Sequence, residues 1–108
     1  MLGGLSRGVD LGPTMARRGL RLHPGQVLRE EYLVPLGINA DTLAEALGLR
    51  TERIAALLAG NRPVTPDIAL RLARYFATTP QFWLSLQAAY DLSVAEAAHG
   101  AWIEARIR

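Results

Sequence analysis

The chain of 108 residues contains no cysteine and no lysine. Without cysteine it cannot form a disulfide, a thiolate metal site or a thiol nucleophile. No apolar run is long enough to span a bilayer. Residues 1–14, with Gly, Ser and Pro scattered among them, lack the hydrophobic region of a secretory signal. By elimination we expect a cytoplasmic protein without a membrane partner.

The sequence also lacks the residue sets that carry catalysis or hold cofactors. We find no paired catalytic carboxylates, no Ser/His/Asp set, no phosphate-binding loop and no metal cluster. His23 and His99 lie far apart, and no carboxylate stands at ligand spacing from His23. We therefore expect His23 to be a structural residue that leads into the first helix. The sequence predicts no enzyme, no cofactor and no small-molecule substrate.

Strand-forming residues are sparse. Hydrophobic residues make up 50% of the chain, which excludes disorder throughout, but Val, Ile and aromatic residues are few beside Leu and Ala. That balance favours helices, and the length suits one domain with a modest core. Twelve arginines against ten acidic residues give a formal charge of +2, which permits nucleic-acid binding without requiring it.

Apolar residues at helical spacing, bounded by capping signals, predict an all-α fold of five short helices. Pro24 suits the first turn of the first helix, and Pro35 and Gly37 are expected to end that helix. Asn39 is a good N-cap for the second helix. The expected helices are about 26–33, 40–47, 51–59, one that begins at Thr65-Pro66 and one that begins at Thr79-Pro80.

The helical pattern divides the chain into three parts. Residues 1–22 carry no sustained periodicity and are expected to form a flexible tail, whose arginines either contact a partner or DNA or have no role. Residues 23–95 form the helical domain. Residues 96–108 are a C-terminal helical extension, which either continues the fifth helix or packs back on it.

The second and third predicted helices are separated only by Gly48-Leu49-Arg50, a connection so short that the helices must cross steeply, as in a helix-turn-helix. Gly48 tolerates the left-handed turn. Ala44, four residues before Gly48, is small enough for a close crossing, and Ile54, six residues after it, fills the gap between the helices. The alternative is an αα-hairpin in an ordinary bundle, but the flanking helices and caps favour the helix-turn-helix.

In a helix-turn-helix reader of DNA, the third helix lies in the major groove with its N-terminal half toward the base edges. We expect the base-edge contacts to come from Thr51, Glu52, Arg53 and Ala56. Arg53 can hold guanine in a bidentate fork, and Ala56 can touch a thymine methyl. Glu52 either accepts from a cytosine amino group or faces the helix dipole or a nearby arginine. Thr51 serves partly as an N-cap and partly as a contact to DNA.

Phosphate contacts require hydrogen-bond donors on both sides of the third helix. Each candidate alone is more often a solvated surface group, but four of them bracket one face, which favours a role in binding phosphates. The predicted phosphate ligands are Asn39, Arg50, Asn61 and Arg62. Arg71 and Arg74, on the fourth helix, are instead expected to be ordinary solvated residues.

Several short motifs stand in order along residues 23–95 and carry a family resemblance. The most specific are the lead-in His23-Pro24-Gly25 and, near the other end, Phe82-Trp83-Leu84, Leu86-Gln87 and Tyr90-Asp91-Leu92. Between them stand Leu43-Ala44, Ala46-Leu47-Gly48, Arg53-Ile54 and Ala69-Leu70-Arg71-Leu72-Ala73. In these motifs the chain resembles the HigA-type antitoxin branch of the phage-repressor-like helix-turn-helix family, also called Cro/C1-type or XRE.

The resemblance implies a function as well as a fold. Members of this family bind and silence a small RelE-like toxin, a ribosome-dependent mRNA endonuclease, and repress the promoter they share with it, usually as dimers. The implied partners are operator DNA, a cognate HigB toxin and a second copy of the chain. Family members often place Pro, Arg and a later Asn where this chain has Arg50, Thr51 and Ala55. Such variation is expected where each protein reads its own operator.

The fifth helix and the extension supply more apolar surface than a five-helix core needs, and a two-fold operator usually demands a dimer. We assign the dimer interface to Phe82, Trp83, Leu86, Tyr90 and Trp102, with the core as the alternative for the aromatic residues of the fifth helix. Two other functions stay open: a stand-alone transcription regulator without a toxin, and a protein-interaction module without DNA binding.

Overall fold

The computed structural model describes residues 22–107, and within them the regular structure consists of five continuous helical segments. The predicted tail lies outside the described residues except for Leu22, which is buried. The first segment is α2 (Pro24–Val27), η3 (Leu28–Leu33) and α3 (Val34–Leu36), followed by α4 (Ala40–Leu47), α5 (Thr51–Leu58) and α6 (Pro66–Phe76). The last segment is α7 (Pro80–Ala95), η4 (Glu96–Gly100) and α8 (Ala101–Arg106). The all-α expectation is confirmed.

The first helix continues through Pro35, so the prediction that this proline ends it is wrong. In an α-helix Pro35 removes one hydrogen bond, and its ring presses on the carbonyl four residues back. Here η3 is a π-helical segment, in which the Val34 N–H reaches back to the Arg29 carbonyl. Such wider turns let a helix accommodate a local defect. The helix ends at Leu36, because Gly37 takes the left-handed conformation with φ 67°.

Side-chain caps fix the starts of three helices, as predicted. The Asn39 Oδ1 accepts a hydrogen bond from the Thr42 N–H at 2.8 Å and begins α4. Thr65 and Thr79 do the same for α6 and α7, at 3.2 and 3.1 Å, and a proline follows each threonine at the first helical position. These caps satisfy backbone donors that lack a partner within their helix.

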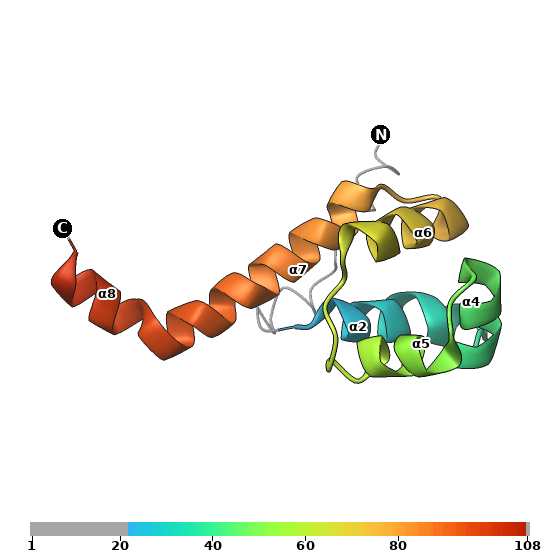
Figure 1. Ribbon diagram of the computed structural model, residues 1–108, viewed down its shortest axis with the longest axis horizontal. Coiled ribbons are helices and arrows are strands. Elements are labelled where there is room, and N and C mark those ends of the chain that lie inside the picture. The colour runs from blue at the N-terminus through green and yellow to red at the C-terminus, as the bar shows by residue number, and fades with distance from the viewer. Residues whose placement is uncertain (1–21, 108) are drawn as a thin grey trace.

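The core lies where the first helix, α4, α5, α6 and the start of α7 meet (Figure 1). Trp83, at 0% exposure, occupies its centre, and its Nε1 donates to the Thr78 Oγ1 at 2.8 Å. The rings of Tyr32 and Phe82 pack against it. Phe82 is itself only 8% exposed. The assignment of Phe82 and Trp83 to a dimer interface is therefore corrected, because the chain buries both side chains by itself.

The C-terminal extension continues the fifth helix instead of packing back on the domain. α7, η4 and α8 follow one another without a break and lead away from the other helices, with a change of direction near η4 (Figure 1). No residue of η4 or α8 is buried. Among residues 22–107, no helix has the length and apolar character needed to cross a membrane.

Candidate nucleic-acid interface

The connection between α4 and α5 has helix-turn-helix geometry. Gly48 closes α4 in the left-handed conformation, with φ 71°. The Leu49 N–H donates to the Ala44 carbonyl at 2.9 Å, and the Gly48 N–H donates to the Glu45 carbonyl at 3.2 Å, the pair of bonds of a Schellman motif. Ala44 and Ile54 are 1% and 0% exposed. The small residue and the packing residue thus lie where the spacing predicted them.

α5 buries Ile54 and Leu57 and leaves its other residues partly or fully accessible. Of the four predicted base-edge residues, Thr51 and Glu52 are exposed, while Arg53 and Ala56 are half-buried. Arg50, not Thr51, occupies the N-cap position, and its side chain makes no capping hydrogen bond. The prediction that Thr51 caps α5 is therefore wrong. Its hydroxyl lies on the first turn of the helix.

Arg50 and Glu52 form an ion pair at the start of α5. The Arg50 Nε lies 3.7 Å from the Glu52 Oε1, and the two side chains are 85% and 80% exposed. A pair this exposed contributes little to stability, because water screens both charges. Both side chains can therefore turn toward a bound ligand at little cost. Pairing with a nearby arginine was one of the alternatives predicted for Glu52.

The four predicted phosphate ligands are all exposed. Asn39 uses its amide oxygen to cap α4, so its amide nitrogen remains the hydrogen-bond donor of that side chain. The Asn61 N–H donates to the Ala56 carbonyl at 2.9 Å, and this bond places Asn61 and Arg62 directly beyond the end of α5. Arg50 precedes the other end of the same helix. Potential phosphate ligands therefore flank α5 at both ends.

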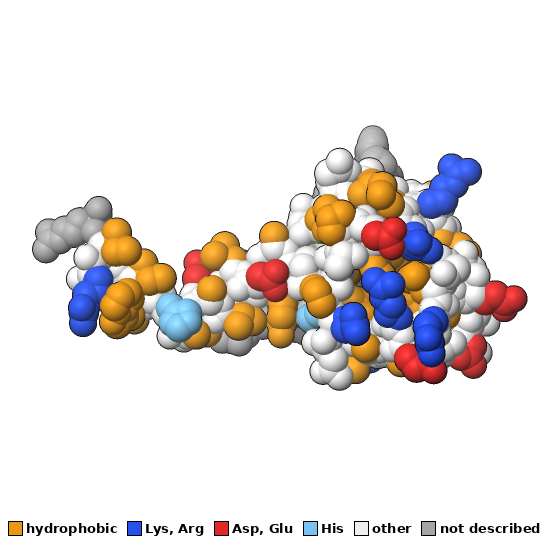
Figure 2. Space-filling view, in the orientation of Figure 1, with side chains coloured by type: hydrophobic (Ala, Val, Ile, Leu, Met, Phe, Trp, Pro, Cys, Tyr) orange, Lys and Arg blue, Asp and Glu red, His pale blue; other side chains and the backbone are white. Residues whose placement is uncertain are grey.

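Arginine side chains gather over the region of α4, α5 and α6, with acidic side chains close beside them (Figure 2). Residues 39–76, which span α4, α5 and α6, carry five arginines and four acidic residues, so the net charge of this segment is +1. Sequence-independent DNA binding depends on an excess of positive charge. This segment therefore provides only a small excess of positive charge for such binding.

The first helix holds the C-terminal end of α5, a contact that the sequence analysis missed. The Arg29 guanidinium donates to the Leu58 carbonyl at 3.0 Å. Gly25 packs against α5 so closely that a Cβ at this position would collide with the Leu57 carbonyl oxygen. No local signal reveals either contact, because the partners are about 30 residues apart in sequence.

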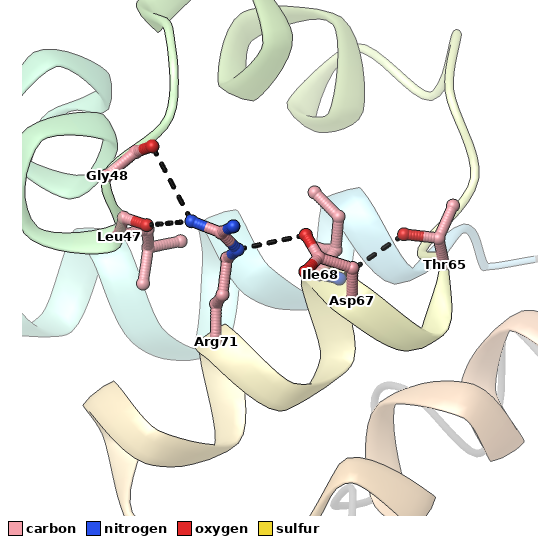
Figure 3. A network of polar contacts seen from close by, with 6 residues as sticks. All are labelled: Leu47, Gly48, Thr65, Asp67, Ile68 and Arg71. Carbon is pink, nitrogen blue, oxygen red and sulfur yellow. Dashed lines mark hydrogen bonds and ion pairs between the residues drawn. The ribbon is translucent and has the colours of Figure 1, made fainter.

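Arg71, on α6, contacts the turn between α4 and α5. Its Nη1 donates to the Leu47 carbonyl at 2.7 Å and to the Gly48 carbonyl at 3.5 Å, and its Nε donates to Asp67 at 2.9 Å (Figure 3). The expectation that Arg71 is an ordinary solvated residue is therefore wrong. Arg74, one turn further along α6, is exposed as predicted.

The sequence model of the helix-turn-helix family matches residues 28–83, about half of the chain. The solved structure of the Pseudomonas aeruginosa antitoxin HigA with the higBA promoter has a TM-score of 0.79 and 40% identity, over 82% of this chain and 96% of that one. The chain is a HigA-type helix-turn-helix protein. The resemblance inferred from the sequence motifs is thereby confirmed.

Curated relatives of this HigA-type protein agree with the structural match. Virulence-associated protein I of Dichelobacter nodosus is 51% identical over 75 residues, which cover 69% of each chain. Antitoxin HigA-1 of Vibrio cholerae is 40% identical over 68 residues, which cover 63% of this chain and 64% of the relative. These relatives are named for virulence association and for antitoxin activity.

His23 is a structural residue of the HigA-type domain, as predicted. Its Nδ1 accepts from the Gly25 N–H at 2.9 Å and caps α2, and its ring meets the Tyr90 ring edge-on at 4.9 Å. Burial lowers the pKa of the imidazole, and the charge of Asp91 offsets part of that effect. Within the part of the chain that the structure describes, no group of three His, Asp or Glu residues is placed to hold a metal ion.

Proposed function

We propose that this protein is the antitoxin of a type II toxin–antitoxin pair. In this proposal a cytoplasmic dimer binds operator DNA in its own promoter and represses it, and the same protein binds and neutralises a RelE-like mRNA endonuclease. It acts by binding and not by catalysis. The observation that carries the proposal is the structural match to an antitoxin solved with promoter DNA. The match covers 96% of that antitoxin and 82% of this chain.

The DNA contact is assigned to α5 and its flanks. In the proposal the N-terminal half of α5 enters the major groove, where Arg53 reads a guanine and Thr51, Glu52 and Ala56 contact neighbouring base edges. The accessibility of these four side chains supports the assignment. The phosphate contacts come from Asn39, Arg50, Asn61 and Arg62, all of which are exposed.

The dimer contact is assigned to the C-terminal extension and the adjoining part of α7. Trp102 and Ile103 are 58% and 45% exposed, and Leu92 is 54% exposed on the preceding turns. Leu92, Ala95 and Ile103 line one shallow groove along this helix. Leu86 and Tyr90 are half-buried, because Leu86 packs against the core and Tyr90 meets the His23 ring, so they can contribute to a dimer contact only with the part of each side chain that stays accessible. Exposed apolar surface of this kind is typical of sites that meet another protein.

A titration of the purified protein with its own upstream DNA tests the proposal. It is carried out at low and near-physiological salt, with a scrambled duplex as the control, and with and without the product of the adjacent gene. We expect binding selective for the upstream DNA and altered by that product. Selective binding that is the same with and without the product of the adjacent gene would indicate a stand-alone regulator. No selective binding, together with a stable complex with the neighbour, would indicate an interaction module without DNA binding.

A further inference from the structure

Arg71 links α6 to the turn of the helix-turn-helix across 24 positions of sequence. Its Nη1 lies 2.7 Å from the Leu47 carbonyl oxygen and 3.5 Å from that of Gly48 (Figure 3). These carbonyls belong to the C-terminal end of α4, where the helix dipole is negative and carbonyl groups lack partners within the helix. A guanidinium is well suited to this end, because it adds a positive charge to two hydrogen bonds.

Asp67 orients the Arg71 side chain through a hydrogen bond. The Asp67 Oδ2 accepts from the Arg71 Nε at 2.9 Å, one turn away on α6, and the Arg71 side chain is 39% exposed. Asp67 lies in the first turn of α6, which Thr65 caps and Pro66 begins, so its backbone is well fixed. The side chain of Arg71 is therefore held at its Nε while its Nη1 holds the turn.

The turn that Arg71 contacts leads directly into α5. Gly48 is followed by Leu49 and Arg50, and α5 begins at Thr51. The far end of α5 is already held by Arg29 at the Leu58 carbonyl. With that end fixed, any loosening of the turn would move mainly the N-terminal half of α5.

We propose that Arg71 is a positioning residue for operator binding: it holds the Leu47–Gly48 turn so that the N-terminal half of α5 meets the base edges in a fixed position. The inference rests on the proposed DNA-binding function. In this role Arg71 acts through the turn, which its Nη1 contacts at two carbonyls while its Nε contacts Asp67. The variants below distinguish this role from phosphate binding through Nη2.

Three single variants test the proposal. Arg71→Gln removes the contact to the turn, and Asp67→Ala removes the acceptor that holds the Arg71 Nε. Arg74→Gln is the matched control, because it removes one arginine charge from an exposed position of the same helix. Affinities for operator and non-operator duplexes are measured at several salt concentrations, well below the melting temperature of each variant. We expect Arg71→Gln to lose roughly tenfold in operator affinity, as one mismatched base pair would cause, and to match the control on non-operator DNA.

Asp67→Ala separates positioning from direct phosphate binding, because the two roles predict changes in operator affinity of opposite sign. It makes the protein more positive, so a phosphate-binding Arg71 would bind all duplexes equally well or more tightly. Positioning predicts a severalfold loss of operator affinity. A uniform loss in Arg71→Gln with a salt slope reduced by about one, or operator affinity equal to that of Arg74→Gln, would overturn the proposal.

Amide hydrogen exchange of the free protein provides a readout that does not depend on DNA. We expect the amides of residues 48–53 to exchange faster in Arg71→Gln than in Arg74→Gln. Equal exchange in the two variants would show that Arg71 does not hold the turn. If the wild-type protein fails to select its operator, the proposed function falls, and the exchange comparison still decides whether Arg71 holds the turn.

Discussion

Two short helices of this protein, α5 and α8, are held in very different ways. α5 buries Ile54 and Leu57, at 0% and 1% exposure; Arg29 contacts its C-terminal end, and Arg71 contacts the turn that precedes its N-terminal end. α8 buries no residue, and Trp102 and Ile103 remain 58% and 45% exposed. Neither helix is long enough to be stable alone in water. α5 is therefore stabilised by the rest of the fold, whereas α8 depends on continuing α7.

The difference separates two kinds of functional surface. A helix that packs against the core with its buried face holds its exposed side chains in a fixed arrangement. Little conformational entropy is therefore lost when a ligand binds. An exposed apolar helix is poorly stabilised by itself and gains stability when another surface covers it. In the proposed function the first description fits the DNA contact and the second fits the contact between two copies.

The largest difference should appear between the two tryptophans. Trp83→Ala empties the centre of the core, and we expect it to lower the free energy of unfolding by about 3–5 kcal/mol. Trp102→Ala, on the exposed extension, should change that free energy by less than about 0.5 kcal/mol in the monomer. Urea denaturation at low protein concentration measures both. Similar losses in the two variants would contradict the description of α8 as unpacked.

The two regions should also respond oppositely to a methyl group on glycine. In Gly25→Ala the new Cβ meets the Leu57 carbonyl, and such overpacking should destabilise the protein by about 1–3 kcal/mol. In Gly100→Ala the new Cβ would lie 3.7 Å from the Glu96 Cβ, an ordinary van der Waals distance. Because Gly100 is helical, this change should stabilise by about 0.5–1 kcal/mol. Thermal unfolding of both variants checks the two signs.

Arg53→Ala tests the base-reading role of α5. We expect it to weaken operator binding by about 1–3 kcal/mol and to relax specificity at one base pair. Arg74→Ala, which removes an arginine from an exposed position of α6, is the control and should leave specificity unchanged. Competition titrations with single-base operator variants measure the effect. An unchanged preference at every base pair would exclude Arg53 as a base contact.

Arg62→Ala should have a smaller and less selective effect. If Arg62 binds a phosphate, the variant should bind all duplexes more weakly by a similar factor, and the salt slope should decrease by about one. Binding isotherms over a range of salt concentrations measure that slope. A loss confined to the operator would contradict the phosphate role.

The smallest expected effect is the pH dependence of stability that comes from His23, the N-cap residue of α2. Burial lowers the pKa of His23 from its ordinary value of 6.5, so the folded chain binds this proton more weakly than the unfolded chain. The contribution to stability is therefore complete above about pH 6.5 and decreases as the pH falls through 6.5 toward the folded pKa. His23→Asn keeps a capping acceptor but does not titrate. Urea denaturation across this range should show a weaker pH dependence in the variant.

Much of the fold was determined by local sequence. Asn39, Thr65 and Thr79 begin helices and Gly48 ends one because their side chains or φ angles act within three or four residues. The three-residue turn and the spacing of Ala44 and Ile54 identified the helix-turn-helix for the same reason. The base-edge and phosphate contacts remain predictions, because they depend on a ligand that the chain alone does not contain.

Tertiary structure alone decided the features in which a residue meets a distant partner. Helical spacing placed Trp83 on an apolar face, but only the packing of α7 on the other helices showed that this face lies in the core. Arg29 and Arg71 were indistinguishable from surface arginines until folding brought carbonyls 29 and 24 residues away within hydrogen-bonding distance. Local sequence sets the face on which a side chain lies, whereas the packing of the whole chain sets what that face meets.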